Sequence, residues 1–92
     1  MLPIFWSAAA LNDLAQITDY IAEYDVHAAI RLHALIENAV RPTSEHPYLY
    51  RPGRVPGTRE LVAHPNYVVV YEVQGDRIEV RAVLHARQEY PT

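Results

Sequence analysis

Residues 59–91 read RELVAHPNYVVVYEVQGDRIEVRAVLHARQEYP, and this stretch decides the fold. Three runs within it, 59–63, 66–73 and 78–85, are strand-like because they are rich in β-branched and aromatic residues, and the last two alternate in period two. The runs are separated by His64-Pro65-Asn66, whose asparagine also begins the second run, and by Gln74-Gly75-Asp76-Arg77. Proline, asparagine and glycine favour tight turns. The stretch therefore predicts three strands joined by two turns and followed by a short polar tail.

The alternation predicts which side chains face the core. In the last run one set of alternate positions is apolar: Ile78, Val80, Ala82 and Leu84. The other set contains Glu79, Arg81, Val83 and His85. Because successive strand side chains point to opposite faces, we expect the first set to pack against helices and the second to face solvent or a partner. The same rule places on one face of the middle run Tyr67, Val69, Tyr71 and Val73.

Two helices are predicted upstream of these strands. Apolar residues recur at helical spacing over residues 8–24, behind Ser7 as a suitable N-cap. They recur again over residues 26–41, behind Asp25 as a second cap, and Pro42 ends this pattern. Since the connection is short, the helices should form an antiparallel hairpin whose apolar faces need a sheet to cover.

Two further segments frame the helices. Residues 2–6 form a short apolar run that suits an edge strand, where Pro3 can lack one ladder donor. Residues 42–57 contain four prolines and two glycines and break all periodicity, so they predict a loop. Loops of this length in compact domains are often functional. Tyr48 and Tyr50 are expected to pin the loop by packing, with direct recognition of a partner as the alternative.

Length and composition limit the classes of protein to which this chain can belong. The 92 residues allow a single domain, 1–92, of ordinary globular composition. The absence of cysteine excludes disulfides and thiolate metal sites and fits a cytoplasmic protein. There is no cofactor motif and no membrane-spanning run, and His27 and His33 lack the one-turn spacing of metal ligands. The net charge of −3 argues against strong non-specific binding to nucleic acid.

The polar tail carries the densest set of functional side chains. His85, Arg87 and Tyr90 close the chain, and Arg59 begins a strand that could lie near them. Arginine can stabilise a transition-state charge, histidine can transfer protons and tyrosine can stack on a base, so these four residues could act on a phosphodiester. A contact surface and an ordinary solvated chain end are the alternatives. Three strand acids are expected to pair with strand arginines as cross-strand neighbours: Glu60, Glu72 and Glu79.

Five segments, taken in order, carry a family resemblance. They are Trp6-Ser7…Asp13-Leu14…Ile17…Tyr20-Ile21, Glu45-His46-Pro47, Gly57-Thr58-Arg59-Glu60-Leu61-Val62, Tyr67-Val68-Val69-Val70-Tyr71 and Val83-Leu84-His85-Ala86-Arg87-Gln88. Together they span essentially the whole chain, which resembles the RelE/ParE superfamily of toxins from bacterial type II toxin–antitoxin modules. The chain is most similar to the ParE-like branch, particularly the short ParE2 type of three-gene modules.

The resemblance implies an α+β fold. An N-terminal strand and an antiparallel two-helix hairpin would pack on a curved, antiparallel-rich sheet of about four strands. It also implies a cytoplasmic toxin without cofactor or metal, held in a hetero-oligomer by a cognate antitoxin from the adjacent gene and touching operator DNA only through that antitoxin. RelE-like members cut mRNA on the ribosome, whereas ParE-like members poison DNA gyrase and arrest growth.

The residues favour the ParE-like branch. Ribosome-dependent members are strongly basic, whereas this chain is acidic, and Val68 stands where their central strand carries an arginine. We therefore predict a non-catalytic toxin that binds DNA gyrase. The alternatives are a ribosome-dependent mRNA endonuclease using Arg59, His85, Arg87 and Tyr90, and a degenerate member that only binds its antitoxin. The predicted antitoxin- or target-binding residues are Arg54, Arg59, Tyr67, Arg81, His85, Arg87 and Tyr90.

Overall fold

Both helices begin at their predicted caps. The computed structural model describes residues 1–91. In it the side chain of Ser7 accepts a hydrogen bond from the amide of Ala10, in the first turn of α1 (Ala8–Ala22). Asp25 does the same for α2 (Val26–Val40). The capping side chains satisfy amides that lack a partner at a helix start, and this fixes where each helix begins. The first helix ends two residues before the predicted end at residue 24, and α2 continues into a 3-10 turn, η1 (Arg41–Ser44).

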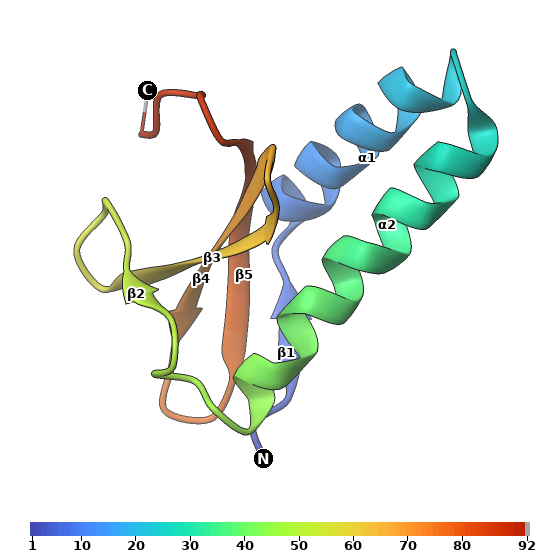
Figure 1. Cartoon of the computed structure of the whole chain (residues 1–92). Helices are drawn as coiled ribbons and strands as arrows, with labels where there is room; N and C mark the ends of the chain where they lie inside the picture. Colours follow the sequence, from blue (N-terminus) through green and yellow to red (C-terminus); the bar gives the residue numbers. More distant parts are fainter. Residues whose placement is uncertain (92) are drawn as a thin grey trace.

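Two helices lie on one face of a single five-stranded sheet (Figure 1). The strands are β1 (Ile4–Trp6), β2 (Arg51–Pro52), β3 (Thr58–His64), β4 (Tyr67–Val73) and β5 (Ile78–His85), in the order β1-β5-β4-β3-β2. The first strand pairs in parallel with β5, and the other three pairs are antiparallel. The α+β class and the helix hairpin are confirmed. The prediction of about four strands omitted β2, a two-residue strand inside the predicted loop at 42–57.

The core lies between the helices and the face of the sheet that they cover, which we call the inner face. Its buried residues are Ala10, Leu14, Ile36, Val40, Leu61, Val69, Tyr71, Ile78, Val80 and Val83. Tyr71 is fully buried, and its hydroxyl donates to the carbonyl of Pro47 at 2.7 Å. The ring of Tyr50 packs edge-on against it, so this tyrosine does pin the loop, whereas Tyr48 is 66% exposed.

The predicted alternation of β5 fails at Arg81. Tyr71 pairs with Val80 and Val70 pairs with Ala82, so Arg81 is an extra residue that forms a β-bulge. Past the bulge the two faces exchange: Val83 joins the inner core, and its amide donates to Asp13 of α1 at 3.1 Å. Two predicted core residues, Ala82 and Leu84, turn to the opposite face.

The same exchange moves His85 to the inner-face side of the sheet, although its side chain is exposed to solvent as predicted. It pairs across the strands with Tyr67, whose ring packs against the inner core, and the two rings meet edge-on at 5.7 Å. Ala82 and Leu84 instead form a second buried cluster with Val70. Within residues 1–91, no helix is long and apolar enough to cross a membrane.

Candidate functional site

The face of the sheet opposite the helices, which we call the outer face, carries three of the predicted site residues: Arg54, Arg81 and Tyr90. Three others, Arg59, Tyr67 and His85, occupy strand positions on the inner-face side. The last strand leads into the tail of residues 86–91, which in Figure 1 lies on the side away from α1 and α2. At the centre of the outer face the cluster of Val70, Ala82 and Leu84 is covered by Tyr90. The tail therefore closes an apolar patch that the inner core does not reach.

Two hydrogen bonds to other segments hold the tail in place. The amide of Ala86 donates to the carbonyl of Asn66 at 2.7 Å, and Nη1 of Arg54 donates to the carbonyl of Gln88 at 3.1 Å. The tail also turns on itself, because the amide of Gln88 donates to the carbonyl of His85 at 2.9 Å. It is thus a folded part of the outer face, not a chain end extended into solvent.

A buried carboxylate organises the loop next to this tail. Glu60 is only 3% exposed, and it accepts the backbone amide of Arg54 at 2.8 Å. Its oxygens also lie 3.2 Å from Nε of Arg54 and 3.3 Å from Nη2 of Arg51. The prediction that Glu60 pairs with arginines is confirmed. A buried carboxylate needs such donors, since an unpaired one would be strongly unfavourable.

The arginine of the β-bulge is also paired. Arg81 donates to Glu79 at 2.6 Å, so this strand acid does pair with an arginine, but along the same strand and not across strands as predicted. Glu79 shares the side-chain amide of Gln74 with Glu72, which lies directly opposite on β4. Glu72 makes no ion pair among residues 1–91, so here the predicted partner is an amide and not an arginine.

Arg59 lies apart from the tail. It pairs with Tyr71 on β4, whereas His85 pairs with Tyr67, four residues further along the same strand. At about 3.3 Å per residue, that offset is roughly 13 Å, before the width of the intervening strand is added. The structure therefore does not bring Arg59 to His85.

The other three residues that could act on a phosphodiester, His85, Arg87 and Tyr90, also do not form one group. Nδ1 of His85 accepts the amide of Arg87 at 3.2 Å, so these two residues are neighbours. His64 packs its ring against Tyr67 at 5.6 Å, and this extends the group at that end of the sheet. Tyr90 instead covers the outer cluster.

Burial changes the acidity of one tyrosine near Arg59. Desolvation raises the pKa of Tyr71 to about 12, with Arg59 acting in the opposite direction and Tyr50 adding a smaller increase. Its hydroxyl is therefore a hydrogen-bond donor at neutral pH, which fits its bond to the carbonyl of Pro47.

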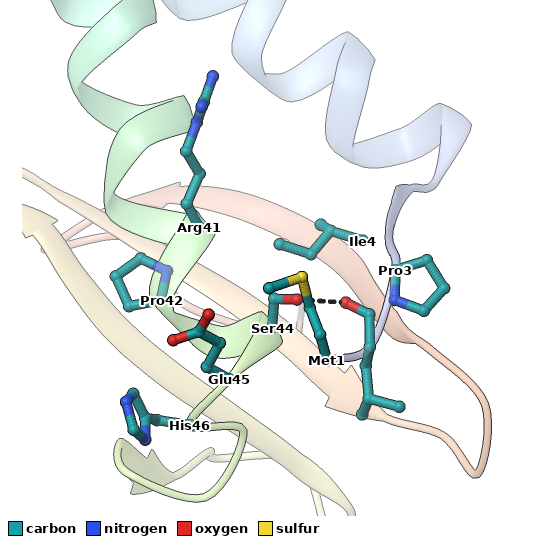
Figure 2. A pocket seen from close by; sticks show the side chains of 9 residues that line it. Met1, Pro3, Ile4, Arg41, Pro42, Ser44, Glu45 and His46 are labelled. Carbon is teal, nitrogen blue, oxygen red and sulfur yellow. Dashed lines mark hydrogen bonds between the residues drawn. The ribbon is translucent and has the colours of Figure 1, made fainter.

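Two hollows lie away from all of the predicted site residues. The larger, of about 870 Å³, lies between the N-terminal residues and η1, where the hydroxyl of Ser44 donates to the carbonyl of Leu2 (Figure 2). The second, of about 380 Å³, is a groove between the two helices. Its lining is Thr18, Asp19, Ala22, Val26, Ala29, Ile30, His33 and Ala34.

The groove between the helices was not anticipated from the sequence. A signal for it exists, because Val26 and Ile30 are apolar and four residues apart, yet they lie outside the stripe that packs on the sheet. In the structure they are 58% and 61% exposed. Within residues 1–91 no three histidine, cysteine or acidic residues gather as metal ligands. Nδ1 of His33 lies 3.1 Å from Oε1 of Glu37, one turn further along α2.

Comparison with known proteins gives sequence relatives along nearly the whole chain. A family model described as the ParE toxin of the type II toxin–antitoxin system parDE matches residues 4–90. The chain is 42% identical over 89 residues to a Sinorhizobium fredii protein named "Putative toxin Y4kP", covering 96% of this chain and 92% of that protein. It is 33% identical over 88 residues to "Toxin RelE2" of Caulobacter vibrioides, covering 94% and 97%.

Solved structures give the same fold. A structure described as the chromosomal ParDE toxin–antitoxin system from P. aeruginosa superposes with a TM-score of 0.81 at 25% identity, over 92% of this chain and 96% of that one. The YoeB dimer from Staphylococcus aureus superposes with a TM-score of 0.63 at 15% identity, over 91% and 95%, which speaks to the fold alone.

Proposed function

The chain belongs to the ParE toxin family of type II toxin–antitoxin systems, and from this membership we propose that it arrests bacterial growth by binding DNA gyrase, without turnover of its own. A cognate antitoxin neutralises it in a hetero-oligomer. The observation that carries the choice of a binding mechanism is the apolar centre of the outer face. Val68, at the position where the RelE pattern has an arginine, is 3% exposed and pairs with Leu84 of the cluster that Tyr90 covers.

The ion pairs and hydrogen bonds of the arginines also support a binding mechanism. A site that cleaves a phosphodiester presents cations to the charge that develops in the transition state. On the outer face Arg54 is held by Glu60 and the carbonyl of Gln88, and Arg81 is held by Glu79. These guanidinium groups are committed to protein partners, so they are better suited to shaping a contact surface than to stabilising a transition state.

The groove between α1 and α2 suits the antitoxin. Its lining combines small side chains, among them Ala22, Ala29 and Ala34, with the exposed apolar side chains of Val26 and Ile30. An amphipathic helix that inserts bulky apolar side chains between small ones would bury this surface. We therefore assign the groove to an antitoxin helix and the outer face to the target.

Growth assays test this proposal. Induction of the chain alone should arrest growth, and co-expression with the product of the adjacent reading frame should restore it. Filamentation and DNA-damage induction are expected, since poisoned gyrase leaves broken DNA. Absence of toxicity, or toxicity that the adjacent gene product does not relieve, would contradict the module assignment.

One observation favours the alternative of mRNA cleavage. His85, Arg87 and Tyr67 lie together at one end of the sheet, and these residue types can move protons and hold phosphate. Primer extension on translated mRNA after induction separates the two functions, because a ribosome-dependent endonuclease leaves cuts in phase with codons. Arg87→Ala should abolish toxicity under that alternative.

A further inference from the structure

A third hollow lies beside Arg59, between the loop that carries Tyr48 and the start of β3. Its volume is about 250 Å³, and it is lined by Tyr48, Pro52, Gly57, Thr58, Arg59 and Val73. It is separate from the tail and from the groove between the helices. Arg59 is the charged residue among those that line the hollow, and the proposed function does not otherwise use it.

The guanidinium of Arg59 is held in a fixed position. Its Nη1 donates to the carbonyl of Tyr50 at 2.7 Å and to that of Tyr48 at 3.4 Å. The same group lies over the ring of Tyr48, 4.9 Å from its centre. A guanidinium carries five N–H donors, and only those on Nη1 are engaged within residues 1–91. The side chain is therefore pre-organised, with donors left to meet a ligand.

Arg59 also differs from the neighbouring arginines in charge compensation. The other arginines on or beside the sheet that have a carboxylate partner are Arg51, Arg54, Arg77 and Arg81. Within residues 1–91, Arg59 has none and is partly buried. A desolvated cation without a counter-charge attracts an anion more strongly than an exposed one.

The size of the hollow decides which anion fits. Small-molecule sites usually occupy about 300–1,000 Å³, so a hollow of about 250 Å³ accommodates the end of one side chain and not a nucleotide. A carboxylate matches the planar fork of arginine and can accept two parallel N–H bonds. The net charge of −3 disfavours a nucleic-acid phosphate.

We propose that Arg59 and Tyr48 form a socket for a single aspartate or glutamate side chain of the antitoxin. The proposed socket depends on the proposed function only because the antitoxin is taken as its partner. Tyr48 is 66% exposed, so a bound partner can also pack on the ring that holds the guanidinium. The socket adds a polar anchor, separate from the apolar groove, that selects an acidic residue at one position of the antitoxin.

The socket itself is tested without any antitoxin. Sodium acetate is titrated into the labelled chain at constant ionic strength, and the Nε–H resonance of Arg59 and the ring resonances of Tyr48 are followed by NMR. Saturable shifts with acetate that are absent with chloride are expected. Shifts that do not saturate, or that appear equally with chloride, would overturn the socket. Tighter saturation by inorganic phosphate would overturn the assignment to a carboxylate.

The partner is tested by the affinity of the adjacent gene product. Arg59→Gln should weaken binding by about 10- to 100-fold, because hydrogen bonds to charged groups contribute strongly. The matched control is Arg77→Gln, which removes an arginine in the turn between β4 and β5, outside the lining of the hollow, and should change affinity less than twofold. Arg59→Lys keeps the positive charge but lacks the planar guanidinium, so its loss of affinity should be smaller than that of Arg59→Gln.

The outcomes separate the two proposals. If the wild-type chain does not bind the adjacent gene product, the module assignment fails, and the acetate titration still decides whether the socket exists. If Arg59→Gln and Arg77→Gln bind equally well to that product, the assignment of the socket to the antitoxin is wrong and the proposed function stands. The circular dichroism spectrum of each variant checks that it is folded.

Discussion

The two faces of the sheet differ in what covers them. The inner face is covered by two helices, and most of its core side chains are fully buried. The outer face has a cluster of three buried residues covered by one tyrosine from a tail without secondary structure. Around that cluster lie charged pairs, among them those of Glu60 and Glu79. The inner face therefore holds most of the buried core, and we propose that the outer face serves recognition of the target.

The largest expected effect is on the inner face. Ile36 is fully buried between α2 and the sheet, so Ile36→Ala removes packing and leaves a cavity. We expect a loss of about 2–5 kcal/mol in the free energy of unfolding. Urea unfolding followed by circular dichroism measures it. A loss below about 1 kcal/mol would mean that the helices pack loosely and that the contrast between the faces is wrong.

High pH should also weaken the inner face. Below pH 10 the hydroxyl of Tyr71 is protonated in both states; between pH 10 and about 12 the unfolded chain releases its proton first. Stability is therefore fully present below pH 10 and is lost as pH rises toward 12, by up to roughly 2.7 kcal/mol for a rise of two pH units in the pKa. Urea unfolding from pH 9 to 12 measures the loss, and Tyr71→Phe should flatten the profile.

Glu60 should be the most sensitive charged residue of the outer face. Glu60→Gln removes the charge that both Arg51 and Arg54 meet, and we expect a loss of about 1.5 kcal/mol because these arginines remain partly in water. The matched control is Glu79→Gln, whose more exposed ion pair with Arg81 should contribute only about 0–1 kcal/mol. Equal losses in the two variants would show that burial of Glu60 has no special role.

The smallest effect on stability is expected at the tail. Tyr90→Ala uncovers the outer cluster, and a partly buried ring should contribute about 1 kcal/mol to the free energy of unfolding. Growth arrest should suffer more than stability, since the tail belongs to the proposed target surface. Growth curves and urea unfolding of the same variant compare the two quantities. Full toxicity with an intact fold would exclude Tyr90 from the target surface.

Local chemistry explains why much of the fold could be predicted. Ser7 and Asp25 cap the helices through bonds to nearby amides, and the strand runs depend on side-chain type and alternation. The bulge at Arg81 could not be predicted in this way. It depends on the register between β4 and β5, and beyond it the amide of Val83 meets Asp13, 70 residues away in sequence.

In the candidate site, too, the residue types could be predicted from the sequence, whereas their spatial grouping could not. The residue types of the tail were visible in the sequence, and Val68 already argued against the RelE pattern. Their grouping was not visible, because Arg54 reaches Glu60 and Gln88 only after the loop and the tail have folded over the sheet. The groove between the helices requires the packed hairpin, which leaves Ile30 exposed.

We propose that this chain inhibits DNA gyrase by binding to it. The most direct measurement is a DNA cleavage assay with purified gyrase, ATP and supercoiled plasmid, with and without the adjacent gene product. The chain is expected to make gyrase accumulate broken DNA, and an equimolar amount of the antitoxin should prevent this. Unchanged gyrase activity, together with codon-phased cleavage of mRNA on purified ribosomes, would contradict the proposal.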